Sequence, residues 1–168
     1  AVETCTPLSV ALKRDIAWAG GKAANLGEMI NAGIPVSDEF VVATSAYRAF
    51  MIEHGLDEMA REALTGVDIQ DSVELASSAS DIRQRIVSKN ISPDLASDIL
   101  QKYTSLEKGL VAVRSSATAE DMDNASFAGQ QDTYLNVEGA VELIRAVRDC
   151  WPSVFEARAI FDREEQGI

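Results

Sequence analysis

Residues 112–137 read AVRSSATAEDMDNASFAGQQDTYLNV. The apolar run 110–114 and the alternating run 132–137 each have the pattern of a β-strand. The segment between them is longer than a connection between two paired strands needs. It is rich in small, hydroxyl-bearing and acidic residues. A connection alone therefore does not explain a loop of this length and composition.

Outward from this stretch, the sequence predicts helices with interspersed strands. Leu26, Met29 and Ile30 have helical spacing, and Gly33 suits the left-handed position after a last turn. Ser92 and Pro93 are typical of a helix start. The other expected strands cover 7–12 and 40–44, and the expected helices cover 20–33, 45–54, 56–66, two stretches within 71–108, 140–151 and 153–165. This order predicts an α+β or α/β-like lobe.

Composition limits the classes of partner. The 168 residues include 15 basic and 27 acidic side chains, which gives a net charge of −12. So acidic a surface repels phosphate backbones, and we expect no nucleic-acid partner. No apolar run approaches the roughly 20 residues that span a bilayer, so we expect no membrane partner. Cys5 and Cys150 form no disulfide or zinc pattern, and the N-terminus has no signal-peptide order, so we expect reduced thiols in the cytoplasm.

Lys22 follows two glycines at the start of an expected helix. The glycines let a ligand approach the backbone, and unpaired N–H groups at a helix start attract anions. A cation in the first turn opposes the helix dipole, at a cost of about 0.3–1 kcal/mol, and a bound phosphate would reverse that cost. The alternative is a solvated lysine beside a simple turn, since the pattern is not a complete P-loop.

Arg114 ends an apolar strand, where it can form a structural ion pair or clamp a phosphate with its planar fork. The carboxylates of Glu120, Asp121 and Asp123 lack the spacing of a calcium loop, which favours solvation or pairing with a basic residue. The single histidine, His54, lies near a helix end, and this position favours a capping role.

Two long motifs carry a family resemblance. GGKAANLGEMINAGIPV (20–36) and VAVRSSATAEDMDNASFAGQQDTYLNV (111–137) resemble the N-terminal nucleotide-binding domain of the family that contains phosphoenolpyruvate synthases, pyruvate phosphate dikinases and rifampicin phosphotransferases. The resemblance covers nearly the whole chain in the same order. It implies that residues 1–168 are the first lobe of an ATP-grasp domain and a fragment of a larger enzyme.

The same resemblance implies the site. Lys22 and Arg114 would contact ATP phosphates, Gly129 would belong to a loop over the phosphates, and Thr133 would lie at the edge of the same site. Magnesium ligands, the phosphorylated histidine and the pyruvate site are expected in the remaining domains, so no catalytic or metal-binding residue is assigned here. His54 does not lie in the family's phosphohistidine motif.

For the parent enzyme, the resemblance implies conversion of ATP, pyruvate and water to phosphoenolpyruvate, AMP and phosphate. A rifampicin phosphotransferase or a pyruvate phosphate dikinase would share the nucleotide domain and differ in the acceptor. A module that binds nucleotide without catalysis is the alternative from another class.

Overall fold

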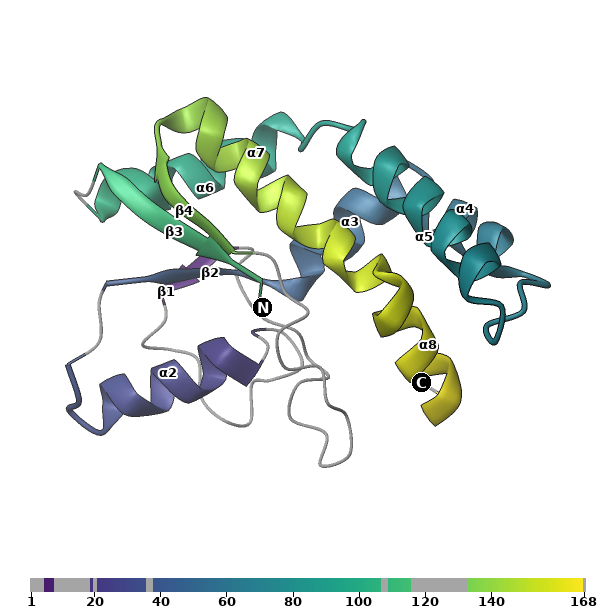
Figure 1. Ribbon diagram of the computed structural model, residues 1–168. Coiled ribbons are helices and arrows are strands. Elements are labelled where there is room, and N and C mark those ends of the chain that lie inside the picture. The colour runs from purple at the N-terminus through teal and green to yellow at the C-terminus, as the bar shows by residue number, and fades with distance from the viewer. Residues whose placement is uncertain are drawn as a thin grey trace.

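The computed structural model describes residues 5–7, 19, 21–35, 38–106, 109–115 and 133–167. These residues form helices and two small antiparallel sheets, of two strands each (Figure 1). The α+β prediction is confirmed at this level. The finer assignment as the first lobe of an ATP-grasp domain stays a prediction.

The first sheet pairs β1 (Cys5–Pro7) with β2 (Phe40–Val42). Alternate residues of β2 face opposite sides of this sheet, as the pleat requires. Val41 packs against Ala23 of helix α2 (Gly21–Asn31), whereas Phe40 and Val42 pack against the main core. The sheet is therefore covered by α2 on one side and by the rest of the molecule on the other (Figure 1).

The second sheet pairs β3 (Leu110–Arg114) with β4 (Thr133–Glu138). Its inner face packs against the main core through four residues, Val111, Val113, Tyr134 and Val137. The register shifts between Val111 and Val113, and Asn136, on the opposite strand, has a φ of 56°. A residue inserted in one strand produces such a shift, and asparagine tolerates the left-handed backbone better than most residues.

The remaining elements are helices. They are α3 (Thr44–Glu53), α4 (Leu56–Leu64), α5 (Ser72–Val87), α6 (Pro93–Ser105), α7 (Ala140–Cys150), the 3₁₀ helix η3 (Trp151–Phe155) and α8 (Ala157–Gln166). Helix α7 lies against the inner face of the β3–β4 sheet, and α8 follows it past η3 toward the C-terminus (Figure 1). No helix in the described ranges is both long enough and apolar enough to cross a bilayer.

The main hydrophobic core joins helices α3 to α7 to both sheets. Its largest fully buried side chains are Phe50 of α3, Ile82 and Ile86 of α5, and Ile99 of α6. Trp151 packs on Phe50 with a ring-centroid distance of 4.8 Å. This continuous core fixes the position of β3 and β4, and therefore of the residues at their ends.

The element predictions that fall on described residues hold with small shifts of boundary. Gly33 has a φ of 79°, and Ser92 caps α6 with Pro93 in its first turn, as predicted. Strand β1 covers Cys5–Pro7 rather than 7–12, and residues 8–12 lie outside the described ones. The α-helical hydrogen bonding of α7 ends before Pro152, but the chain continues as η3, because proline is tolerated in a first helical turn.

His54 occupies the C-cap position of α3, as predicted. Its side chain, however, does not bind the carbonyl groups at the end of α3. The Nε2 atom donates to the backbone oxygen of Asn90 at 2.9 Å, and the ring packs edge-on against Phe50. His54 therefore ties the end of α3 to the connection between α5 and α6.

Candidate nucleotide site

Lys22 lies in the first turn of α2, where its side chain is exposed. This first turn contains no acidic residue. Helix α2 is anchored on the sheet below it, because Ala23, Leu26 and Ile30 pack with Val41. Helix α2 is thus held in place by packing and carries a lysine beside its N-terminus. This arrangement suits an anionic ligand.

Arg114 and Thr133 are paired in the β3–β4 register, at the end of the ladder. Both residues are exposed. A guanidinium and a hydroxyl at the same strand ends can donate several hydrogen bonds to the oxygens of one ligand. The structure therefore brings together two of the residues that the sequence predicts for the site.

Glu39 is a neighbour of Arg114 that the sequence analysis missed. It precedes β2, and its Oε1 atom lies 3.4 Å from Nη2 of Arg114. The pair links the residue before β2 to the end of β3. The two positions are 75 apart in the chain, and no local sequence pattern connects them.

Ser115 follows Arg114 directly. Among the described residues, its Oγ atom is the one buried side-chain oxygen or nitrogen with no hydrogen-bond partner. Buried polar groups usually have a partner, so an unpaired one needs an explanation. In the sequence, Ser115 is one of several hydroxyl-bearing residues that follow the strand, and no local pattern distinguishes it.

Gly129 lies outside the described residues, so its predicted place over the phosphates stays a prediction. No contact between Lys22 and Arg114 is established within the described ranges, and their joint contact with one ligand is also still a prediction. The described residues of the candidate site are thus Arg114, Thr133 and Lys22, and Glu39 and Ser115 are neighbours of Arg114.

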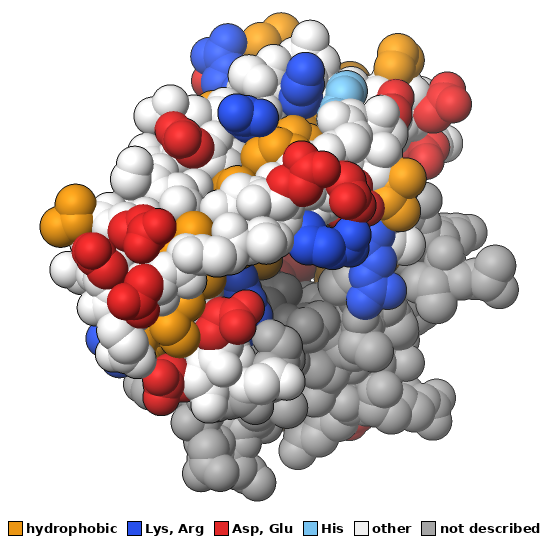
Figure 2. Space-filling view, turned by 90° about the vertical axis from the view of Figure 1, so that its right-hand side faces the viewer, with side chains coloured by type: hydrophobic (Ala, Val, Ile, Leu, Met, Phe, Trp, Pro, Cys, Tyr) orange, Lys and Arg blue, Asp and Glu red, His pale blue; other side chains and the backbone are white. Residues whose placement is uncertain are grey.

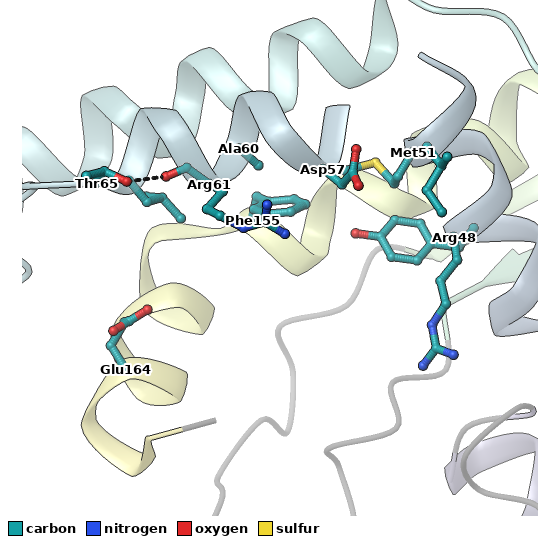
Figure 3. A pocket seen from close by; sticks show the side chains of 11 residues that line it. Arg48, Met51, Asp57, Ala60, Arg61, Thr65, Phe155 and Glu164 are labelled. Atoms are coloured by element: carbon teal, nitrogen blue, oxygen red, sulfur yellow. Dashed lines mark hydrogen bonds between the residues drawn. The ribbon is translucent and has the colours of Figure 1, made fainter. Parts of the chain in front are cut away.

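A separate pocket of about 550 Å³ lies between α3, α4, Phe155 and α8 (Figure 3). None of the predicted site residues lines it. Its wall includes apolar side chains such as Met51, Ala60 and Phe155 together with the charged side chains of Arg48 and Glu164.

Acidic, basic and apolar side chains are interspersed on the face shown in Figure 2, so the net negative charge does not make that face uniformly acidic.

Tyr47 lines this pocket and has a strongly perturbed acidity. Burial raises the pKa of its phenol to about 12, and the positive charge of Arg163 opposes that rise. Burial likewise lowers the pKa of Arg163, while Tyr47 and Glu164 oppose that shift. These shifts involve side chains of α3 and α8, and none of the predicted site residues contributes to them.

The family resemblance implies magnesium ligands in the remaining domains and assigns none to this chain. Nowhere in the described ranges do three histidine, cysteine, aspartate or glutamate side chains gather closely enough to hold a metal ion. Mg²⁺ in nucleotide sites is held by one or two carboxylates and by the phosphates themselves.

Sequence comparison identifies the class of protein. Residues 16–168 match the family described as pyruvate phosphate dikinase, AMP/ATP-binding domain. Because this match covers most of the chain, the chain belongs to that family.

Curated relatives narrow the assignment. The chain is 48% identical over 161 residues to a probable phosphoenolpyruvate synthase of Methanocaldococcus jannaschii, with 92% of this chain and 14% of the relative covered. It is 47% identical to a probable phosphoenolpyruvate synthase of Methanothermobacter thermautotrophicus, with 93% of this chain and 24% of the relative covered. It is 42% identical to the phosphoenolpyruvate synthase of Pseudomonas aeruginosa, with 92% of this chain and 20% of the relative covered. The chain thus spans 14% to 24% of the length of these relatives.

Proposed function

We propose that this chain is the ATP-binding part of a phosphoenolpyruvate synthase. The parent enzyme would convert ATP, pyruvate and water to phosphoenolpyruvate, AMP and phosphate through a phosphohistidine. The relatives named phosphoenolpyruvate synthase support this proposal, as does the family's AMP/ATP-binding description. The histidine that carries the phosphoryl group, the pyruvate site and the magnesium ligands would belong to other domains of the same polypeptide, in the cytoplasm.

The observation that carries the proposal is the pairing of Arg114 with Thr133 at the end of the β3–β4 ladder, in a chain of an ATP-binding family. Phosphoryl transfer depends mainly on positioning and on electrostatic stabilisation of the phosphates. The fork of Arg114 can bind two phosphate oxygens, and the hydroxyl of Thr133 can donate to a third. Lys22 would add a point charge at the N-terminus of α2.

The rest of the nucleotide site follows from the same proposal. Gly129 would come close to the phosphates from the loop that precedes β4, since glycine lets a backbone approach a ligand closely. An ATP-grasp architecture would enclose the nucleotide between this lobe and a second one. Exclusion of water by such closure strengthens the electrostatic interactions in the site.

Substitution of the two cations tests the proposal. In the complete polypeptide, Lys22→Ala and Arg114→Ala should each reduce ATP-dependent phosphorylation by about 30-fold to 1000-fold, which corresponds to roughly 2–4 kcal/mol of transition-state stabilisation. Arg145→Ala is the control, because Arg145 is an exposed arginine of α7 with its own partner, Glu142. Wild-type rates with Lys22→Ala or Arg114→Ala, in folded protein, would remove that residue from the site.

The isolated chain should bind ATP weakly. An incomplete cleft leaves part of the nucleotide in water, so affinity should fall by several kcal/mol relative to the complete site. Titration calorimetry that detects micromolar ATP binding by residues 1–168 alone would contradict this expectation.

The sequence that follows residue 168 in the gene would decide the acceptor. A phosphohistidine domain followed by a pyruvate-binding domain supports a synthase or a dikinase. An open reading frame that ends near this point supports a module that binds nucleotide without catalysis.

A further inference from the structure

Arg114 has an anionic neighbour in the protein itself. Its Nη2 atom lies 3.4 Å from Oε1 of Glu39, with the two side chains 51% and 28% exposed. Strong charge-assisted contacts between an arginine and a carboxylate are about 2.7–2.9 Å long and are often bidentate. The Arg61–Glu58 pair in the same chain reaches 2.7 Å. The Arg114–Glu39 contact is therefore long, and only one pair of atoms makes it.

A contact of this kind holds its partners weakly. Partly exposed ion pairs contribute little to stability, because water solvates both charges and the side chains lose freedom. A glutamate has three rotatable side-chain bonds, so its carboxylate can leave the guanidinium without a change in the backbone. The geometry argues against a rigid clamp that fixes the orientation of Arg114.

The same contact places a negative charge beside the cation that would receive ATP phosphates. Glu39 directly precedes β2 of the first sheet, whereas Arg114 and Thr133 belong to the second sheet. A phosphate bound to Arg114 and a carboxylate a few ångströms from the same guanidinium repel each other. The site must lose the Glu39 contact, or tolerate that repulsion, when a polyphosphate binds.

We propose that Glu39 is the resident counter-ion of Arg114, which ATP phosphates displace, and that it lowers the affinity of the site for nucleotide. This inference rests on the proposed role of Arg114 in ATP binding. It makes Glu39 a determinant of nucleotide affinity that acts through Arg114 and does not itself bind ATP.

Neutralisation of Glu39 tests the inference. Glu39→Gln keeps the shape of the side chain and removes its charge, so the dissociation constant for ATP in the complete polypeptide should fall by about threefold to tenfold at low salt. The gain should shrink as ionic strength rises, because salt screens partly exposed charges. Calorimetry or fluorescence titration with ATP measures both effects.

Glu142→Gln is the matched control. It removes one negative charge and breaks another exposed arginine–glutamate pair, at 3.2 Å on α7, so it repeats the change in net charge at a different place. ATP affinity should stay at the wild-type value in this variant. An equal gain in both variants would mean that total charge, and not the contact with Arg114, sets the affinity, and would overturn the inference.

The double variant Glu39→Gln with Arg114→Ala separates this inference from the proposed function. If Glu39 competes for Arg114, its substitution should lose most of its effect once the arginine is absent. If Arg114→Ala leaves ATP binding unchanged, the proposed site itself is wrong. If Arg114→Ala weakens binding while Glu39→Gln leaves it unchanged or weakens it, the site stands and only the competition is excluded.

Discussion

Arg114 and Thr133 are partners in the last pair of the β3–β4 ladder, although 18 residues separate them in the chain. The ladder holds their backbones together while both side chains are exposed. Packing of the inner face of this sheet on the core maintains that position. Two polar side chains are thus presented by paired strands, which position a ligand-binding group more accurately than an isolated loop does.

Thr133→Val should weaken ATP binding without loss of stability. Valine keeps the β-branched shape that favours a strand and removes only the hydroxyl. Loss of one hydrogen bond to a charged phosphate should raise the dissociation constant for ATP in the complete polypeptide by about tenfold or more. Thr104→Val is the control, since the Thr104 hydroxyl donates to the backbone oxygen of Leu100 on α6, among residues not assigned to the site. If both variants bind ATP as the wild type does, Thr133 is not a ligand.

Ile82→Ala should destabilise the chain by about 2–5 kcal/mol, because it leaves a cavity in the middle of the main core. Ile82 has no exposed surface. Val73→Ala is a matched control on the same helix α5, where Val73 is 77% exposed, and it should change the free energy of unfolding by less than about 0.5 kcal/mol. Urea denaturation measures both values. A small effect at Ile82 would mean that the core repacks around the missing methyl groups.

The sequence predicted what depends on local chemistry. Helix spacing, the glycine at the end of α2 and the Ser92–Pro93 start of α6 are local signals, and the structure confirms each of them. The position of Arg114 at the end of a strand could also be predicted, because an apolar run precedes it.

Contacts between residues far apart in the chain could not be predicted from the sequence. The Glu39–Arg114 contact joins positions 75 residues apart, and the register shift opposite Asn136 depends on how two distant strands pair. The bond from His54 to Asn90 likewise requires α3 and the end of α5 to be packed first. Periodic patterns in the sequence do not predict such contacts, so only the structure identifies the partners of the candidate site residues.

Asp71→Ala should lower stability by about 1 kcal/mol through loss of a helix cap. The Asp71 carboxylate accepts hydrogen bonds from the backbone N–H groups of Val73 and Glu74 at 3.0 and 3.1 Å. These groups have no partner within the helix, so an alanine leaves them to water. Asp81→Ala, at an exposed position inside α5, serves as the control and should have little effect. Equal free energies of unfolding for the Asp71 variant and the wild type would exclude a capping contribution.

Tyr47 should make stability fall at high pH. Burial raises the pKa of its phenol from 10.0 to about 12 in the folded chain, against the pull of Arg163 in the opposite direction. A group with a raised folded pKa contributes stability that is fully present below its unfolded pKa, here near 10, and is lost as the pH rises through the folded value. Tyr47 should therefore cost the folded chain up to about 1.4 kcal/mol per pH unit between pH 10 and pH 12.

Cys5 adds a similar loss of stability at lower pH, because burial raises the pKa of its thiol to about 11. Urea denaturation of wild type and Tyr47→Phe across this range isolates the tyrosine, since phenylalanine keeps the ring that packs on Trp151. The difference between the two curves should be flat below pH 10 and slope above it. Arg163→Gln should raise the pKa of Tyr47 further, because it removes the charge that stabilises the phenolate. A lower phenol pKa in that variant, or parallel stability curves for Tyr47→Phe and the wild type, would show that Tyr47 is not buried beside Arg163 in solution.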